Sequence, residues 1–309
     1  MRAPRFSVII PVFNGERFVA RAIESVLAQS FPPEEVLIVD DGSTDATSQV
    51  VARYGTRVRY LKQANQGVSV ARNAGARAAS GDWLAFLDAD DWYFPDRLRL
   101  HADLLSANGD VDFLTGDYEY RDSNDNLLGR SMEKRASGKN LLRKAANGLT
   151  VIMEEQDFEE FVADHFGDMH TLSVPRSTFL TLGGYAQGFK VCEDVHFLVR
   201  LVSTSRRAGI VCRPLGVYVI HDESATRKDR LQAQRENVRT LLDLRRFDHS
   251  FPPPVRRGLR RLLARARADL GYALIRDDKW LAAVRAVIPI IWESPGFRST
   301  KTLLSIMRH

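Results

Sequence analysis

Apolar residues recur in short, continuous runs through the first third of the chain, with longer amphipathic stretches between them. Continuous apolar runs are typical of strands that are buried on both faces of a parallel sheet. The stretches between the runs repeat apolar positions at helical spacing. This alternation predicts an open α/β sheet flanked by helices. The predicted strands are Phe6–Ile10, Val36–Val39, Val58–Leu61, Trp83–Leu87 and Val111–Leu114, and the predicted helices are 16–29, 46–54, 68–79 and one that begins after Pro95.

The pattern changes beyond residue 116. Residues 117–165 are polar and irregular, which indicates an insertion, and apolar runs return over 170–222. From about Lys228 the pattern is helical, and Pro252–Pro254 indicates a linker before a long, arginine-rich helix. We therefore expect an α/β domain over residues 1–225, divided near residue 116, and a helical C-terminal region over residues 226–309.

Composition narrows the class of protein. The 309 residues are 44% apolar and 27% charged, as in globular proteins, with a formal net charge of +5. That charge suits phosphate-rich ligands or an anionic membrane, although a solvated basic face is equally consistent with it. The two cysteines, Cys192 and Cys212, show no zinc-site spacing, and we expect them to be buried and reduced. Because neither a signal peptide nor a membrane-spanning run is evident, we expect a cytoplasmic protein, at most peripheral on the inner face of the cell membrane.

Acidic residues follow two of the predicted strands. Asp88, Asp90 and Asp91 come directly after the strand 83–87, and such close carboxylates repel one another unless a cation lies between them. Oxygen ligands suit Mg²⁺ or Mn²⁺, although acidic residues are also common at helix N-termini. Asp40 and Asp41 end another strand, where they would bind a nucleoside or cap a turn. Ligands of α/β sheets bind beyond the carboxyl ends of the strands, so we expect these carboxylates to converge.

A series of motifs over roughly residues 5–100 occurs in a specific order. In this order the chain resembles the family 2 inverting glycosyltransferases, which share the GT-A fold. The resemblance implies a mostly parallel sheet, Mg²⁺ or Mn²⁺ as cofactor, and transfer of a sugar from a nucleoside diphosphate donor, expected to be a UDP-sugar. The acceptor hydroxyl would belong to a glycan or a lipid-linked acceptor. The matching segments are Ser7–Asn14, Glu24–Ser30, Val39–Asp45, Asn65–Gly75, Gly81–Asp91 and Pro95–Leu98.

The resemblance also assigns roles to single residues. Asp88 and Asp90 correspond to the DXD pattern and would bind the metal, with Asp91 as a further carboxylate. The looser matches at 183–185 and 192–197 imply that Asp194 is the catalytic base and that Glu193 positions the site. The residues assigned to donor binding are Pro11, Phe13, Asp40, Asp41, Arg72 and Asp88.

Three histidines are also interpreted, one as a metal ligand and two as structural residues. His221, which follows the predicted strand 217–220, is assigned as a further metal ligand, with a structural role as the alternative. His170 and His196 are interpreted as structural. On this assignment residues 1–116 form the nucleotide-binding half of the catalytic domain and residues 117–225 the acceptor-binding half.

Two other functions are weighed against sugar transfer. A nucleotidyltransferase of similar topology would need a basic, glycine-rich phosphate loop after the first strand, which residues 12–16 do not provide. A non-catalytic nucleotide-sugar-binding protein would not need the intact carboxylates. The C-terminal arginines suit a packed helix, a dimer contact or a peripheral membrane contact. Because no aromatic residues are interleaved with them, we expect no binding to nucleic acid.

Overall fold

The computed structural model describes residues 3–145, 148–167, 169–221 and 229–293. The chain forms two compact units. The first lies within residues 1–155, 165–187 and 204–221, and the second within residues 156–164, 188–203 and 222–309. Each unit is therefore built from segments that are far apart in the sequence. The predicted boundary near residue 225 stays a prediction.

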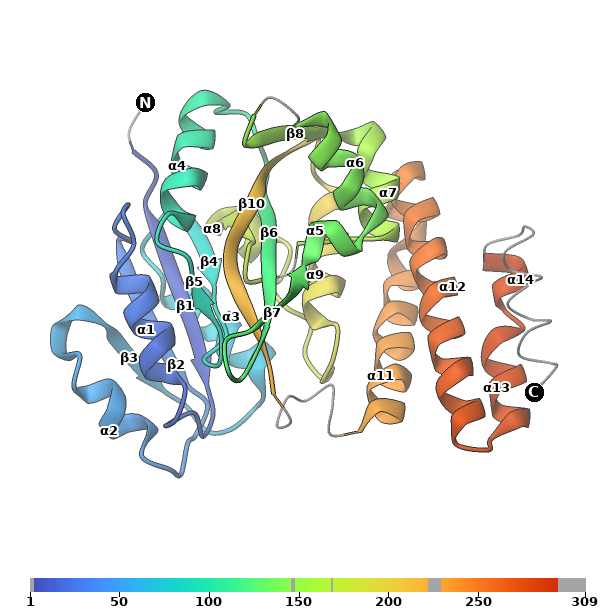
Figure 1. The fold of residues 1–309 in the computed structure, drawn as a ribbon, viewed down its shortest axis with the longest axis horizontal. Coiled ribbons are helices and arrows are strands. Elements are labelled where there is room, and N and C mark those ends of the chain that lie inside the picture. Colours follow the sequence, from blue (N-terminus) through green and yellow to red (C-terminus); the bar gives the residue numbers. More distant parts are fainter. Residues whose placement is uncertain (1–2, 146–147, 168, 222–228, 294–309) are drawn as a thin grey trace. The chain divides into compact units, whose positions relative to one another are not determined.

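The described part of the first unit contains a ten-stranded sheet in the order β3-β2-β1-β4-β9-β6-β10-β5, with β7 paired to β6 and β8 paired to β10 (Figure 1). β1 pairs in parallel with β2 and β4, and β6 pairs in parallel with β10, while β9 is antiparallel to both β4 and β6. The predicted α/β sheet with flanking helices is thus confirmed. The strands are β1 (Phe6–Val12), β2 (Glu35–Asp40), β3 (Arg59–Lys62), β4 (Trp83–Phe86), β5 (Trp92–Tyr93), β6 (Phe113–Asp122), β7 (Leu127–Arg130), β8 (Thr150–Glu154), β9 (Ser173–Pro175) and β10 (Arg207–Ile220).

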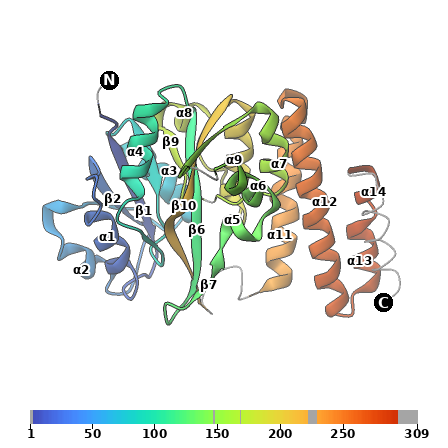
Figure 2. The ribbon, with the colours of Figure 1, turned by 45° about the horizontal axis from the view of Figure 1, so that its top comes forward.

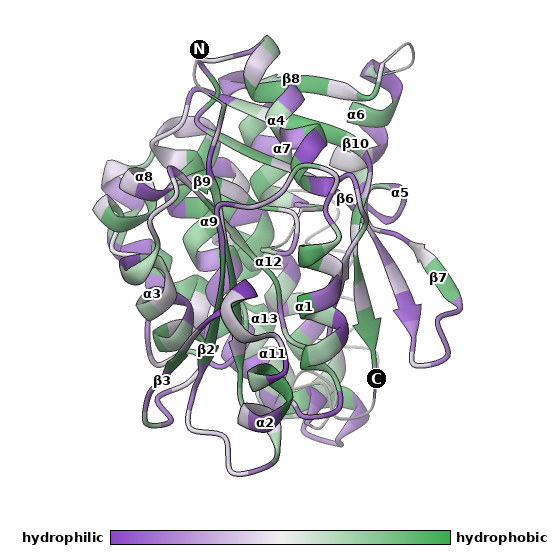
Figure 3. Ribbon diagram, turned by 90° about the vertical axis from the view of Figure 1, so that its left-hand side faces the viewer, coloured by the Kyte–Doolittle hydropathy of each residue, from purple (hydrophilic) through white to green (hydrophobic). Residues whose placement is uncertain are grey.

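Helices cover both faces of this sheet, which explains the continuous apolar runs. Val8 and Ile10 of β1 belong to the core that also contains residues of α1, α2 and α4. Ile9 lies on the opposite face, where α3 packs so closely that a Cβ on Gly75 would be 2.5 Å from the Ile9 side chain. Figure 2 shows these helices around the sheet, and Figure 3 shows the mainly apolar strand β2 among them. The helices of this unit are α1 (Val19–Leu27), α2 (Thr47–Ala52), α3 (Val68–Ala78), α4 (Arg97–Ala107), α5 (Ser131–Lys134), α6 (Ala136–Lys144) and α8 (Arg176–Thr181), with a 3₁₀ turn at Gly55–Arg57.

The expectation that residues 117–165 are irregular is wrong. β6 continues from Phe113 to Asp122, and most of it is buried. Its polar side chains find partners: the Asp117 carboxylate accepts the backbone N–H of Met132 at 2.8 Å and that of Tyr118 at 2.9 Å. Burial raises the pKa of Asp117 to about 6. A strand with satisfied buried polar groups carries no apolar run, so the sequence pattern did not reveal it.

α2 begins at Thr47, and before it the Ser43 hydroxyl accepts the backbone N–H of Asn14 at 2.9 Å. One local expectation is also wrong. Cys192 and Cys212 are only half-buried, and neither forms a disulfide. Burial nevertheless raises the pKa of Cys212 to about 11, so this thiol stays protonated at neutral pH.

The described part of the second unit is helical. Pro252–Pro254 is not a linker, because α12 begins at Pro253, where prolines fit the first helical turn. Arginines of α12 pair with acidic residues at α7: Arg261 binds Glu160 at 2.7 Å, and Arg265 binds Asp164 at 2.5 Å. The predicted packed helix is therefore found inside this unit. Among the described residues, no helix has the length and apolar character needed to cross a membrane. The helices are α7 (Phe158–Ala163), α9 (Glu193–Ser203), α11 (Arg230–Asp243), α12 (Pro253–Arg276), α13 (Trp280–Val287) and α14 (Ile290–Glu293), with 3₁₀ turns at Glu155–Asp157 and Leu244–Ser250.

Candidate functional site

The loops after β1 and β2 are joined by hydrogen bonds at one edge of the sheet. The Asn14 side-chain oxygen accepts the backbone N–H of Thr44 at 2.9 Å. In return, Glu16 accepts the backbone N–H of Ala46 at 2.8 Å. Asn14 has a φ of 50°, in the left-handed region that asparagine tolerates. The parallel strands therefore place these two loops side by side, as the sequence predicts.

Asp40 and Asp41, at the end of β2, are both buried and hydrogen-bonded. Asp40 is fully buried, and it accepts the backbone N–H of Ser43 at 2.7 Å and the hydroxyl of Tyr60. Asp41 accepts the Gln63 amide and the backbone N–H of Gly67, each at 2.7 Å. Asp40 therefore holds the turn together, while Asp41 orders the loop before α3. Their assignment to donor binding stays a prediction, and for Asp40 it would require the turn to open.

Phe13 and Pro11, the other donor-binding candidates at this edge, differ in accessibility. The side chain of Phe13 is 51% exposed, whereas Pro11 is buried within β1. An exposed aromatic ring at a strand end is available to a flat ligand such as a nucleobase. Phe13 therefore has the accessibility that its assignment requires, and Pro11 does not offer a side-chain surface.

Arg72 and Asp88 form an ion pair at the centre of the site. The guanidinium of Arg72, on α3, lies 2.7 Å from Asp88 Oδ1, and the Arg72 side chain is only 3% exposed. The ring of Tyr185 lies 5.3 Å from the guanidinium. Asn73 fixes Tyr185 by two hydrogen bonds, from its amide to the Tyr185 carbonyl at 2.8 Å and from the Tyr185 N–H at 2.9 Å. Two motifs distant in sequence thus hold one arginine against the first DXD carboxylate.

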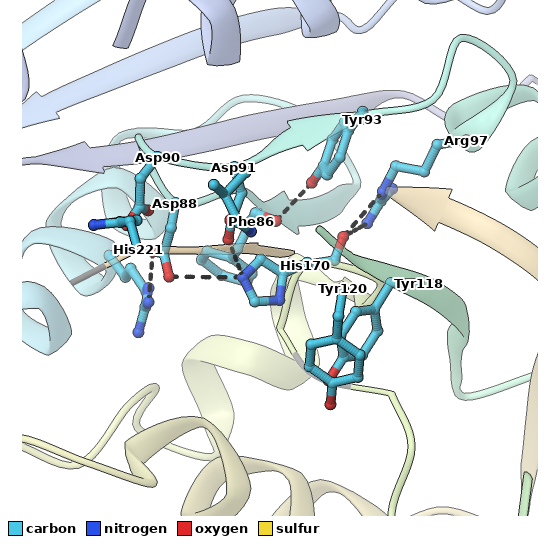
Figure 4. A network of polar contacts seen from close by, with 12 residues as sticks. Phe86, Asp88, Asp90, Asp91, Tyr93, Arg97, Tyr118, Tyr120, His170 and His221 are labelled. Atoms are coloured by element: carbon cyan, nitrogen blue, oxygen red, sulfur yellow. Dashed lines mark hydrogen bonds and ion pairs between the residues drawn. The ribbon is translucent and has the colours of Figure 1, made fainter. Parts of the chain in front are cut away.

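Asp90 pairs with His221. The Asp90 carboxylate lies 2.9 Å from His221 Nε2, and the imidazole stacks on Phe18 with ring centroids 5.3 Å apart (Figure 4). Asp90 is also the more accessible of the two, since 36% of its side chain is exposed against 13% for His221. The structure therefore brings together the second DXD carboxylate and the histidine that the sequence assigned to the same metal.

Asp91 pairs with His170, which the sequence did not assign to the site. His170 Nε2 lies 2.5 Å from Asp91 Oδ2 and 3.8 Å from Asp88 Oδ2 (Figure 4). Asp91 is 2% exposed, and it also accepts the backbone N–H of Val219 at 2.7 Å. Burial, opposed by the nearby imidazole and reinforced by Asp90 and Asp88, raises the pKa of Asp91 to about 7. Asp88, Asp91 and His170 each place one potential ligand atom within 4.8 Å of the others.

Arg97 fixes the segment that carries His170. This arginine is fully buried and donates to the carbonyls of His170 at 3.4 Å and Leu172 at 2.8 Å, and to the Ser173 hydroxyl at 3.1 Å. Its guanidinium lies 4.4 Å from the centroid of the Tyr93 ring. Burial raises the pKa of Tyr93 to about 12, so its hydroxyl keeps the proton that it donates to the Phe86 carbonyl at 2.6 Å. Residues of α4, β5 and β9 therefore hold the backbone around His170 in place (Figure 4).

The donor set suits a divalent cation. Carboxylate oxygens are preferred by Mg²⁺ and Mn²⁺, and imidazole nitrogen favours the softer of these two ions. Asp88, Asp91 and His170 bring potential ligand atoms together, Asp90 lies next to them in the sequence, and Arg72 is the cation paired with Asp88. His170 and His221, which reach these carboxylates, add nitrogen ligands or hydrogen bonds. Carboxylates this close favour a bound cation, because it removes their mutual repulsion.

Glu193 and Asp194 lie in the second unit, at the start of α9. Glu193 is buried, while Asp194 is half-buried, and acidic residues in a first turn are favoured by the helix dipole. Their predicted roles as positioning residue and catalytic base therefore stay predictions. His196, on the same helix, is buried between Phe189 and Asp243, with Nε2 3.3 Å from the Asp243 carboxylate.

The contribution of His170 had no signal in the local sequence. A lone histidine before a short strand resembles any buried histidine, and its partner Asp91 is distant in the chain. Asp91 itself was expected only as a further carboxylate. The pairing follows from β9 lying beside β4 in the sheet, and that antiparallel insertion cannot be read from a pattern of apolar runs.

The model of the family described as "Glycosyl transferase family 2" matches residues 7–158. An "Uncharacterized glycosyltransferase" of Rickettsia felis is 41% identical over 106 residues, which are 34% of this chain and 18% of that protein. Another of Haemophilus influenzae is 26% identical over 258 residues, covering 78% of this chain and 80% of the other. The chain thus spans well under half the length of the first relatives that it matches.

Solved structures share the fold over nearly the whole chain. S. aureus TarS 1-349 in complex with UDP-GlcNAc has a TM-score of 0.66 at 16% identity, covering 98% of this chain and 89% of TarS 1-349. The mannosyltransferase PcManGT from Pyrobaculum calidifontis, in complex with GDP-Man and Mn²⁺, has a TM-score of 0.63 at 19% identity, covering 100% of this chain and 81% of that one. At these identities the similarity establishes the fold, which is GT-A-like with C-terminal helices.

Proposed function

Because the model of glycosyltransferase family 2 matches residues 7–158, we propose that this chain transfers a sugar from a nucleoside diphosphate donor to an acceptor hydroxyl. The GT-A-like fold and the donor-bound state of two proteins that share it support this reading. TarS 1-349 is described in complex with UDP-GlcNAc, and PcManGT with GDP-Man and Mn²⁺. We propose a UDP-sugar as the donor and a glycan or lipid-linked glycan as the acceptor.

One observation carries the proposal: the three carboxylates that follow β4 are each paired with a basic side chain, and two of them share His170. Arg72 lies 2.7 Å from Asp88, His221 lies 2.9 Å from Asp90, and His170 lies 2.5 Å from Asp91. We propose that Asp88 and Asp90 hold Mn²⁺ or Mg²⁺, with His221 as a further ligand and the Asp91–His170 pair behind them. A divalent cation bound there would stabilise the negative charge that develops on a departing diphosphate.

Besides its ion pair with Asp88, Arg72 is proposed to bind the donor. Its guanidinium is buried beside Asp88, so it remains charged and oriented in the absence of a ligand. A guanidinium is well suited to phosphate oxygens, because its donors match two of them at once. We therefore assign Arg72 to the diphosphate side of the donor, and Phe13 and Asp41 to the nucleoside side.

Asp194 is proposed as the base that takes the proton from the acceptor hydroxyl. A neutral hydroxyl is a weak nucleophile, so a carboxylate must accept its proton as the bond to the sugar forms. A single in-line displacement then inverts the anomeric centre. The half-buried side chain and the position of Asp194 at the start of α9 are compatible with this role, and Glu193 would position it.

A donor-binding experiment paired with a transfer assay tests the proposal. Thermal shifts are measured with UDP-GlcNAc, UDP-glucose and GDP-mannose, each with and without Mn²⁺. We expect stabilisation by a UDP-sugar only when Mn²⁺ is present, and loss of that effect in Asp90→Asn. Asp194→Asn should keep the thermal shift and lose at least 100-fold in turnover. Donor binding without turnover in the unmodified chain, over a range of acceptors, would instead indicate a non-catalytic nucleotide-sugar-binding protein.

A further inference from the structure

An exposed apolar face runs along α13 and α14 in the second unit. The two helices follow one another closely, and the buried residues Ala283, Val287 and Ile290 lie on the side toward α12. The other side is apolar but exposed to solvent, with Leu281 67% exposed and Trp292 78% exposed. At helical spacing these residues form one stripe rather than scattered positions. The stripe consists of the exposed residues Trp280, Leu281, Ile288, Ile291 and Trp292 and the half-buried Val284.

The composition of this stripe is that of a membrane-interface segment. Tryptophan is found near both ends, at Trp280 and Trp292, and aliphatic residues lie between them. Tryptophan prefers the headgroup layer of a bilayer, because its ring is apolar while its indole N–H stays hydrated. Single exposed apolar residues are ordinary on protein surfaces, but a contiguous patch of this kind marks an interaction site.

Charge favours an anionic partner. Arg285 is exposed beside the stripe, whereas the exposed Lys279 lies 2.9 Å from the Asp277 carboxylate. The sequence after residue 293 contains basic residues but no aspartate or glutamate. Three arginines of α12 are not available to bind an anionic partner, because they pair with acidic residues at α7; they are Arg257, Arg261 and Arg265. The basic helix that the sequence suggested for a membrane contact is thus used for packing, and the exposed stripe lies on the next helices.

We propose that the α13–α14 stripe docks this protein in the interfacial layer of an anionic membrane. Even as one continuous helix, residues 280–293 would extend only about 21 Å, short of the roughly 30 Å of a bilayer core, and the segment is interrupted between α13 and α14. The segment therefore lies on the membrane surface, with its apolar side chains inserted at the boundary between headgroups and acyl chains. This inference does not depend on sugar transfer, and its test needs neither donor nor acceptor.

Vesicle flotation tests the proposal on the full chain. Vesicles of phosphatidylcholine with 30% phosphatidylglycerol are compared with vesicles of phosphatidylcholine alone. The double variant Leu281→Ser with Trp292→Ser should reduce partitioning into the anionic vesicles at least tenfold, since the free energy of burying one large apolar side chain already suffices for that factor. The matched control is Leu127→Ser with Leu128→Ser, which alters two comparably exposed residues of β7 and should leave partitioning unchanged.

Tryptophan fluorescence provides a second readout. Emission should shift to the blue when anionic vesicles are added, and Trp280→Phe with Trp292→Phe should abolish the shift while flotation persists. Equal partitioning of the serine variant and its control would overturn the proposal. So would a dimer, measured by light scattering, that the serine variant separates while no vesicle binding is found, because a second copy would then cover the stripe.

Discussion

Two adjacent glycines allow the cost of one close contact to be measured separately from backbone strain. Gly183 and Gly184 both have positive φ, at 77° and 68°. A Cβ on Gly183 would meet nothing within 4 Å, whereas one on Gly184 would lie 3.0 Å from Asn73 Cγ, 3.0 Å from Phe179 Cε1, and closer still to Asn73 Oδ1. Replacing each glycine with alanine therefore imposes the same backbone penalty, but only Gly184→Ala also imposes a clash.

The magnitudes follow from these contacts. Placing an L-residue in the left-handed region costs about 1–2 kcal/mol, which is the whole expected effect of Gly183→Ala. Gly184→Ala must also displace Asn73, whose side chain makes both hydrogen bonds to the Tyr185 backbone. Leaving those buried groups unpaired costs about 1–3 kcal/mol each. We expect Gly184→Ala to destabilise the first unit by about 3–8 kcal/mol, at least 2 kcal/mol more than Gly183→Ala.

Urea unfolding monitored by tryptophan emission can report on the first unit alone. The chain has four tryptophans, of which Trp83 and Trp92 belong to the first unit. In a Trp280→Phe, Trp292→Phe background, the emission change therefore follows that unit. If the two alanine variants shift the free energy of unfolding equally, the Asn73–Tyr185 contact does not hold these segments together, and our account of Arg72 positioning fails.

Further predictions concern His170, Arg97 and His196. His170→Asn should weaken Mn²⁺ binding 10- to 100-fold in a calorimetric titration, whereas unchanged affinity would restrict His170 to structural support of Asp91. Arg97→Met should cost roughly 3 kcal/mol in urea unfolding, because three buried acceptors lose their donor, while the exposed Arg99→Met should cost under about 1 kcal/mol. Burial, together with Arg200, lowers the pKa of His196 to about 4, below the 6.5 of the unfolded chain. The neutral imidazole therefore contributes fully to the free energy of unfolding above pH 6.5. This contribution declines as the pH falls toward 4, by about 3 kcal/mol in all. His196→Gln should remove that part of the decline in unfolding free energy measured between pH 4 and pH 7, and a parallel decline in both proteins would refute the assignment.

The sequence predicted the parts of the fold that depend on local patterns. β1, β2 and β4 are continuous apolar runs, and Val68–Ala78 is helical close to its predicted bounds. The prediction that the carboxylates after β2 and β4 lie at the same edge of the sheet follows from the rule that the carboxyl ends of parallel strands meet there. Arg72, Asp88, Asp90 and His221 were assigned to one site, and the structure joins them in two pairs.

The parts that the sequence did not predict depend on contacts between distant segments. β6 was assigned as irregular beyond Leu114, because its buried polar residues are satisfied only by partners such as Thr171 and Met132. His170 was interpreted as structural for the same reason. Its position depends on Arg97 and on the insertion of β9 between β4 and β6, neither of which leaves a periodic signal.

The insertion of β9 also determines when this site can form during synthesis. A chain emerges from the ribosome N-terminus first, and the segments that emerge early begin to fold before the later ones are available. When residues 88–91 emerge, the segment that carries His170 and the strand that donates the Val219 N–H to Asp91 have not yet been made. The acidic cluster, which ends at Asp91, is therefore synthesised 79 residues before His170 and 128 residues before Val219. Ligands of this edge consequently stabilise the completed unit and cannot guide the first steps of its assembly.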